Sequence, residues 1–475
     1  MARYFAGLDV STQSCKFVII DWDNHTLEYV GRVNYDEELP QYKTENGVAT
    51  GNELGVSESN PLMWIDAVEK VFKKTADSGF PMKYIKSISV SGQQHGLVAL
   101  DSSGNLARTM AKLWNDFSTQ EECDLLTEKM GGNDNMISET SNTQRTGYTA
   151  AKIYHMYRHE RDIYNNTHIL FLVHNYINWY LTGGVAVMEP GDTSGTALWN
   201  PATQNWSNDL ISIIDPDLAG KLPKVESSTK SIGTISKLLA ERFGFSIECK
   251  IDAGSGDNMY GAVGTGNVKP GIVTVSLGTS GTAYTFLEKP YVDPEGEIAS
   301  FCDSTGNYLP LLCVSNLANG FDEFCRINNL IPRQFDELIN ETEPGNDGRI
   351  LIPWYEGERT PDIPNATPIY FGFSLHDFDK KTLARAIIEG HLLNLYNGFK
   401  SLPVIPKQIH LTGGLSQSPA WCQTIADIFG AKTTPIIGEG AALGAAIHAC
   451  WVWLNEIGES IEIDQVCNNF VSFNK

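Results

Sequence analysis

The sequence lacks the short motifs that mark the commonest nucleotide-binding enzymes. It has no G-x-x-x-x-G-K-[ST], which excludes a P-loop. It also has neither H-R-D nor D-F-G, so it is not a protein kinase of the usual kind. The turn Gly254-Ser255-Gly256 lacks the third glycine of a dinucleotide fingerprint, which weakens that interpretation. No His/Cys set has metal-ligand spacing, so the expected metal is a hard cation such as Mg²⁺, held by oxygens and phosphates.

The sequence is also poor in positive charge and in features of exported proteins. Its formal net charge of -22 repels polyanions, so neither nucleic acid nor an acidic membrane is expected as a main partner. The nine cysteines include no C-x-x-C pair, and their number is odd, which is typical of cytosolic proteins. No long apolar run precedes Asp9, so no signal peptide is expected. The most apolar window, 169–181, carries one histidine and two asparagines, which predicts a buried helix and not a membrane span. We therefore expect a cytoplasmic protein.

The length and the order of patterns predict two α/β domains. A chain of 475 residues exceeds what one core usually serves, and we place the border near residue 250, giving domains 1–250 and 251–475. Two strand pairs look alike: 5–10 with 15–21, and 273–277 with 282–287, each joined by a hydroxyl-rich tip. This repeat predicts duplicated halves facing each other across a ligand-binding cleft, although such tips also occur in ordinary turns.

The stretch 249–286 predicts the chemistry. Asp257 lies in a Gly-rich turn, a helix-like segment follows at 258–263, and the tip Gly278-Thr279-Ser280-Gly281 has the glycines that let backbone N–H groups surround a phosphate. The acid and the tip are about twenty residues apart, which allows them to face one cleft. An acid beside a phosphate cradle predicts phosphoryl transfer to a hydroxyl group. A turn-forming role for Asp257 is the alternative.

Polar clusters that follow apolar runs predict a site for a polyhydroxylated ligand. The strand 85–91 ends in Ser91-Gly92-Gln93-Gln94-His95-Gly96, and Asp192 lies in the small-residue turn 191–195. The same groups could instead satisfy buried loop atoms or form a tight turn. Lys152, at the entry to a predicted helix, is expected to be a surface charge of that helix.

A second glycine-rich turn predicts a nucleotide-binding site. The strand 408–412 delivers Gly413-Gly414-Leu415-Ser416-Gln417-Ser418 onto the helix 419–429, where glycines allow close approach and amides donate. The segment 438–450 reads as a small-residue helix and is a candidate for a moving contact between the halves.

With these motifs in this order, the chain resembles the FGGY family of carbohydrate kinases. GLDVSTQS and SLGTSGT are similar to the two phosphate loops of the family, LTGGLSQSPAW to its adenosine segment, and DAGSGDNMYGAVG to the segment with its catalytic aspartate. TAAKIYHMYRHE and FGFSLHDFDKKTLARAIIEG resemble its signature regions. Within the family, SGQQHG, LWND, GDTSGTALWN and GDN are most similar to the sugar pocket of xylulose kinases.

The resemblance implies a fold, cofactors and site residues. The implied fold has two actin-like ATPase (ribonuclease H-like) domains, and the implied cofactors are ATP and Mg²⁺. Asp257 would be the general base, and Asp9 would hold Mg²⁺. The implied sugar contacts are Gln94, His95, Arg145, Asp192, Asp257 and Asn258. The implied ATP contacts are Ser11, Thr12, Gln13, Gly278, Thr279, Ser280, Gly413, Gly414 and Ser418.

Three functions stay open at this point. The first is phosphorylation of the terminal hydroxyl of a ketopentose, D-xylulose above all. The second is the same reaction on ribulose, another ketose or a polyol. The third is an ATP-binding sugar sensor without catalysis, against which the presence of Asp257 argues. By analogy with the family, a homodimer is also expected.

Overall fold

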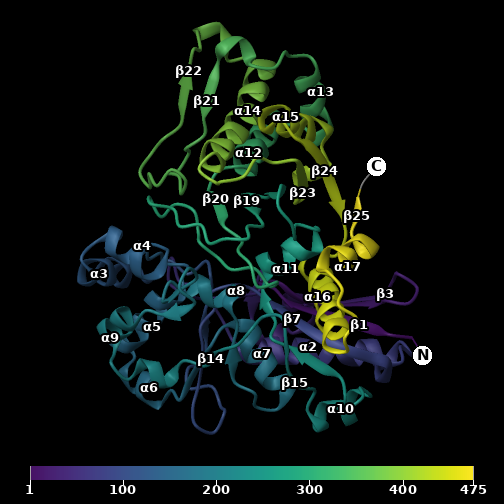
Figure 1. Cartoon of the computed structure of the whole chain (residues 1–475). Helices are drawn as coiled ribbons and strands as arrows, with labels where there is room; N and C mark the ends of the chain where they lie inside the picture. The colour runs from purple at the N-terminus through teal and green to yellow at the C-terminus, as the bar shows by residue number, and fades with distance from the viewer. Residues whose placement is uncertain (1, 474–475) are drawn as a thin grey trace. The chain divides into compact units, whose positions relative to one another are not determined.

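A computed structural model describes residues 2–473 of the chain. Its backbone forms two compact units (Figure 1). Unit 1 comprises Met1–Val268, Ser300–Tyr308 and Gly438–Val471, and unit 2 comprises Lys269–Ala299, Leu309–Ile437 and Ser472–Lys475. The domain border near residue 250 stays a prediction.

Unit 1 is built on a seven-stranded mixed sheet. Its strands are β1 (Tyr4–Val10), β2 (Ser14–Asp21), β3 (Thr26–Asn34), β7 (Ile85–Gly92), β15 (Ser231–Thr234), β16 (Lys250–Asp252) and β17 (Ser255–Gly256). The order is β15-β16-β7-β1-β2-β3, and β17 pairs with β7. β1 runs antiparallel to β2 and parallel to β7, so the predicted first hairpin is confirmed and its tip lies at the carboxyl end of β1.

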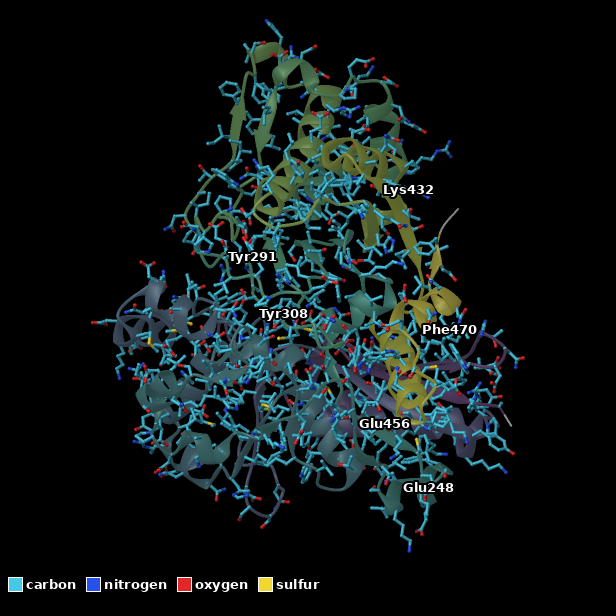
Figure 2. All side chains as sticks on the ribbon, viewed as in Figure 1. Glu248, Tyr291, Tyr308, Lys432, Glu456 and Phe470 are labelled. Carbon is cyan, nitrogen blue, oxygen red and sulfur yellow. The ribbon has the colours of Figure 1, made fainter. Side chains whose placement is uncertain are left out.

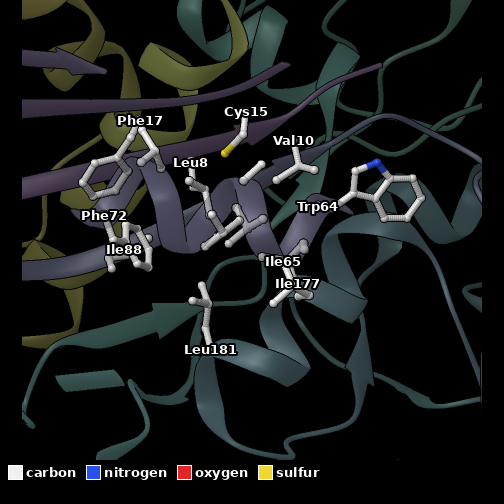
Figure 3. Packing of buried hydrophobic residues seen from close by; sticks show 14 of the residues in the cluster. Leu8, Val10, Cys15, Phe17, Trp64, Ile65, Phe72, Ile88, Ile177 and Leu181 are labelled. Atoms are coloured by element: carbon white, nitrogen blue, oxygen red, sulfur yellow. The ribbon is translucent and has the colours of Figure 1, made fainter. Parts of the chain in front are cut away.

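Helix α2 (Pro61–Asp77) shows why these elements pack. The Asn60 side chain caps it by accepting from Leu62 N, and Pro61 occupies the first turn, where its missing N–H costs nothing. Its apolar side chains recur every three or four residues and are buried in the core of the unit. In Figure 3, Phe72 of this helix lies beside Phe17 of β2, with ring centroids 5.1 Å apart. The helix therefore covers one face of the sheet.

Helix α16 (Ala441–Glu456) also belongs to unit 1, although it lies far along the chain. It contacts β1, β7 and α11 (Asp257–Gly264). Glu456 near its end, labelled in Figure 2, accepts from Ser231 N and Oγ at 2.8 Å. Its small residues serve close packing inside this unit, and the moving contact between the halves stays a prediction.

Unit 2 repeats the sheet of unit 1. Its six strands are β18 (Ile272–Leu277), β19 (Gly281–Thr285), β20 (Leu311–Val314), β23 (Gln408–Thr412), β24 (Lys432–Ile437) and β25 (Ser472–Phe473), in the order β20-β19-β18-β23-β24-β25. From β20 to β25 the pairings are antiparallel, antiparallel, parallel, parallel and antiparallel. The pairings from β3 to β15 in unit 1 follow the same sequence. The predicted duplication is therefore present in the topology.

The other helices of at least seven residues are divided between the two units. In unit 1 they are α3 (Gln120–Met130), α4 (Asn133–Thr140), α5 (Thr149–His159), α7 (Val173–Thr182), α9 (Asn208–Ile214), α10 (Lys237–Phe243) and α17 (Ile463–Phe470). In unit 2 they are α12 (Ala318–Asn328), α13 (Pro332–Asn340), α14 (Lys380–Phe399) and α15 (Pro419–Phe429).

The prediction for the apolar window 169–181 was wrong in part. The window begins with a short strand, β10 (Ile169–Phe171), before helix α7. In unit 2, a short strand of the same length, β21 (Ile350–Ile352), pairs with β22 (Ile369–Phe371). Each of these strands is only three residues long, too short to show a period of two in the sequence.

Candidate active site

The carboxyl ends of three parallel-paired strands bring the first site residues together. Asp9 of β1 is in register with Ser91 of β7, and Ser255 of β17 is in register with the same residue. Asp257 follows β17 directly and opens helix α11. In α/β sheets ligands bind at this edge, because the strand ends leave polar turns there.

Asp9 lies at the centre of this edge. Its Oδ1 accepts a hydrogen bond from Ser91 Oγ at 2.7 Å. Burial raises the pKa of Asp9 to about 6, although the bond from Ser91 and the positive charge of Lys16 favour the ionised form. A carboxylate that is costly to ionise is stabilised by an added cation.

Asp257 has a more strongly perturbed carboxyl group. Its Oδ1 accepts from Asn258 N at 2.9 Å, and the side chain keeps some contact with solvent. Burial raises the pKa of Asp257 to about 8, and the negative charges of Asp9 and Asp192 add to the effect. A carboxyl group with a pKa near the operating pH is suited to general base catalysis.

Helix α11, which begins with Asp257, is held by close packing and a buried polar chain. A Cβ on Gly444 of α16 would collide with Tyr260 O, so only glycine lets the two helices approach this closely. Tyr260 OH lies 2.6 Å from Ser89 Oγ of β7 and 3.3 Å from His448 Nδ1 of α16. The position of Asp257 is therefore fixed by the packing and hydrogen bonds of helix α11.

Four of the predicted sugar residues form a connected cluster. Gln94 Oε1 accepts from Asn258 Nδ2 at 2.7 Å, and Gln94 Nε2 lies 3.4 Å from Asp192 Oδ1. His95 Nδ1 lies 4.0 Å from the same Asp192 oxygen. Within residues 2–473, the neighbouring Gln93 Nε2 is buried without a hydrogen-bond partner in the protein. Buried polar groups are rarely left so, and a hydroxylated ligand is a suitable partner.

Sequence reasoning missed two buried residues behind Asp192. His174 Nδ1 lies 3.3 Å from Asp192 Oδ2, and its Nε2 lies 3.6 Å from Glu189 Oε1. Glu189 accepts from the backbone N–H groups of Gly191 and Asp192 at 2.6 and 2.7 Å. Burial raises the pKa of Glu189 to about 7, against the opposing charge of His174. The polar residues inside the apolar window 169–181 were the available signal.

The prediction that Lys152 is a surface charge was wrong. Its side chain is only 1% exposed, and Nζ donates to His95 O at 2.8 Å and Gly147 O at 2.7 Å. Burial lowers the pKa of Lys152 to about 7. His95 itself has a φ of 65°, which is uncommon outside glycine, and Thr149 Oγ1 also donates to its carbonyl at 3.2 Å. Lys152 thus holds the backbone of a predicted sugar contact.

Arg145 lies in the loop before α5. Its Nε is 3.5 Å from Thr143 Oγ1, and its carbonyl accepts from Tyr148 N at 2.9 Å. Its sugar contact stays a prediction.

The first hairpin tip is internally bonded. Ser11 Oγ donates to Ser14 O at 2.9 Å, closing the turn. Thr12 Oγ1 donates to Gln93 Oε1 at 3.2 Å and accepts from Trp114 Nε1 at 3.1 Å, while Gln13 is exposed. Through Gln93, the tip is therefore connected to the cluster of predicted sugar residues. Its phosphate contacts stay predictions.

In unit 2, the second tip and the glycine turn lie at one sheet edge. β18 and β23 are parallel with Ser276 in register with Thr412, so the segments 278–281 and 413–418 follow adjacent strand ends. Thr279, Ser280, Gly413 and Gly414 are exposed. Gly413 has a φ of 86°, and a Cβ there would lie 2.5 Å from Leu277 O, so glycine is required. Ser418 Oγ donates to Asp336 Oδ1 at 2.7 Å, and it also caps α15.

Comparison with known proteins identifies the family. The model of the N-terminal domain of the FGGY family of carbohydrate kinases matches residues 4–264, and the model of its C-terminal domain matches residues 273–453. The chain belongs to the FGGY family of carbohydrate kinases. It is therefore an ATP-dependent sugar kinase, and the predicted fold class is confirmed.

Individual relatives of this FGGY kinase span nearly its whole length. The xylulose kinase of Haemophilus influenzae is 33% identical, and the match covers 98% of this chain and 93% of that protein. The xylulose kinase of Streptomyces coelicolor is 31% identical, covering 95% and 88%. The crystal structure of xylulose kinase from Bifidobacterium adolescentis is 25% identical with a TM-score of 0.84, covering 100% and 96%.

The residues of unit 1 suit a hard divalent cation. Asp9 offers carboxylate oxygens, the ligands that Mg²⁺ prefers, and it lies close enough to Asp257 to raise the pKa of that group. A cation held by Asp9 would offset this accumulation of negative charge.

Among residues 2–473, no helix is long and apolar enough to cross a membrane.

Proposed function

We propose that this FGGY kinase transfers the γ-phosphoryl group of ATP to the terminal hydroxyl of D-xylulose, giving D-xylulose 5-phosphate. The observation that carries the proposal is the carboxyl group of Asp257, whose pKa is raised to about 8, beside the polar cluster of Gln94, Asp192 and Asn258. The choice of D-xylulose is supported by the relatives, since xylulose kinases match over almost the whole chain.

In the proposed reaction, Asp257 accepts the proton of the sugar's terminal hydroxyl as its oxygen attacks the γ-phosphorus. The bond from phosphorus to the bridging oxygen of ADP breaks, and ADP leaves with that electron pair. A general base contributes about 10²- to 10⁴-fold, and the positioning of substrates and neutralisation of charge supply the rest.

The polar cluster would orient the sugar. Gln94, Asp192 and Asn258 are already joined by hydrogen bonds, so they present fixed donors and acceptors to the sugar hydroxyls. His95 and Arg145 are proposed as further contacts. Preorganised groups of this kind reject analogues that lack a matching hydroxyl, because buried polar atoms are then left unpaired.

Phosphate contacts are assigned to each hairpin tip by itself. We assign Ser11, Thr12 and Gln13 of the first tip, and Gly278, Thr279 and Ser280 of the second, to this role. Gly413, Gly414 and Ser418 would contact the remainder of the nucleotide. Mg²⁺ held by Asp9 would supply positive charge to the transferring phosphoryl oxygens. A cytoplasmic location and a homodimer belong to the same proposal.

A coupled ADP-release assay over a panel of sugars tests the proposal. We expect kcat/KM to be highest for D-xylulose, with D-ribulose, other ketoses and polyols well below it. A maximum at another ketose or polyol would refute the substrate and keep the chemistry. A flat response to every sugar, with ATP still bound, would favour the sensor.

A further inference from the structure

A group of possible metal ligands lies between helices α3 and α5. Glu122 of α3 is 1% exposed, and the side chains of His155 and His159 of α5 are 22% and 45% exposed. His155 Nδ1 lies 3.3 Å from Glu122 Oε2, and His159 Nε2 lies 3.0 Å from Glu122 Oε1. Figure 1 shows the two helices in the same part of unit 1, where they contact each other. None of these residues belongs to the proposed sugar or ATP site.

The ligand set is one that transition-metal ions prefer. Residues four apart on a helix share one face, so His155 and His159 present their rings to the same point. One ligand atom from each of the three residues lies within 4.8 Å of the others. Zinc binds histidine nitrogen and carboxylate oxygen at about 2.0 to 2.2 Å, which places tetrahedral ligands roughly 3.4 Å apart. The two His–Glu separations, 3.3 and 3.0 Å, are therefore close to those of a zinc site.

We propose that Glu122, His155 and His159 bind one Zn²⁺ ion, which ties α3 to α5. The half-exposed His159 gives the ion access from solvent, and a water molecule would complete the coordination. Sequence reasoning found no His/Cys set with metal-ligand spacing. It missed this group because the third ligand is a glutamate on a different helix.

Arg158 competes with the ion for the carboxylate. Its Nη1 donates to Glu122 Oε1 at 2.5 Å, and its Nη2 donates to Glu121 Oε1 at 2.6 Å. A dication at the site would repel the guanidinium group and take one of its acceptors. Removing this positive charge should therefore strengthen zinc binding, whereas an ordinary cluster of ion pairs would gain no metal affinity from the change.

The ion would also fix a helix that supports the proposed sugar site. Lys152 and Thr149, at the start of α5, hold the carbonyl of His95. Zinc binds the folded chain at a site that needs both helices in place, so it should raise the melting temperature. This effect does not depend on the identity of the sugar.

The test is a zinc titration of the full-length, tag-free protein after metal removal, with a chromophoric chelator as competitor. We expect one tightly bound Zn²⁺ per chain and a raised melting temperature. His159→Ala should weaken binding by more than the roughly 10- to 100-fold that loss of an outer partner costs. Glu122→Gln should weaken it similarly, and His168→Ala, an exposed histidine in the same unit, should leave it unchanged.

Arg158→Gln gives an independent result of opposite sign. It retains all three ligands, and we expect at least a several-fold tighter zinc affinity. Absence of a bound ion in the wild-type chain and in this variant would overturn the proposal. Unchanged affinity in His159→Ala, with the fold verified by circular dichroism, would also overturn it, because the ion would then lie elsewhere.

Discussion

Replacing Asp257 with asparagine should remove catalysis and, at the same time, stabilise the free protein. Asparagine has the same shape and can still accept from Asn258 N, but it has no charge. Turnover with the sugar should fall by about 10²- to 10⁴-fold, which is the contribution of a general base. ATP binding should stay near the wild-type value.

The gain in stability follows from the raised pKa. In the folded chain the pKa of Asp257 is about 8, against 3.8 for the ordinary group, so the unfolded chain loses its proton first as pH rises. Below about pH 4, Asp257 is protonated in both states and does not change the free energy of unfolding. Between about pH 4 and pH 8, the free energy of unfolding of the wild type decreases. The raised pKa lowers the free energy of unfolding of the wild type by at most about 5 kcal/mol at pH 8 and about 2 kcal/mol at pH 5.5. Residual solvation of the side chain reduces both values.

Thermal and denaturant unfolding at the two pH values measures this difference. The excess stability of Asp257→Asn over wild type should be larger at pH 8 than at pH 5.5. Asp252→Asn is a matched control, because burial also raises the pKa of Asp252, to about 6, while its carboxylate accepts from Ser87 away from the sugar cluster. It should gain less stability and retain turnover. Equal stability differences at both pH values, or retained turnover in Asp257→Asn, would refute the reasoning.

Three other predictions concern the same enzyme. Lys152→Met should raise KM for the sugar about 10- to 100-fold, since two hydrogen bonds of about 1 kcal/mol each are lost and the His95 backbone is released; unchanged KM would contradict this. Gly413→Ala should weaken ATP binding and lower the melting temperature, whereas Gly220→Ala, where a Cβ has open space and which is not a proposed nucleotide contact, should do neither. In a pH profile, kcat/KM should rise with pH to about 8 as Asp257 deprotonates, and Asp192→Asn should move this limb to lower pH because a negative charge is removed.

Local patterns were enough to predict both hairpins and the sheet edge that carries Asp9. Each hairpin forms from residues adjacent in sequence, so alternation and tip composition describe it fully. The position of α16 was not predictable in this way. It joins unit 1 from residues 441–456, and the sequence shows only that its residues are small, not which surface they approach.

The burial of a charged residue could not be predicted from the sequence either. Lys152 follows the same helical pattern whether its face meets solvent or the carbonyl of His95. His174 and Glu189 are likewise separated in sequence, yet in the fold His174 Nε2 lies 3.6 Å from Glu189 Oε1 and both residues contact Asp192. Contacts of this kind depend on tertiary packing, so motif reading identified the predicted sugar residues but not the groups that hold them.

These supporting groups explain how one edge of a sheet accommodates three carboxyl groups. Asp192 lies beside His174 and Gln94, whereas Asp257 accepts from Asn258 and is exposed to the negative charges of Asp9 and Asp192. The unfavourable charge is thus concentrated on the residue proposed to accept a proton. Moving that proton from the sugar to Asp257 removes a negative charge from the cluster, so the repulsion that destabilises the free enzyme favours the reaction step itself.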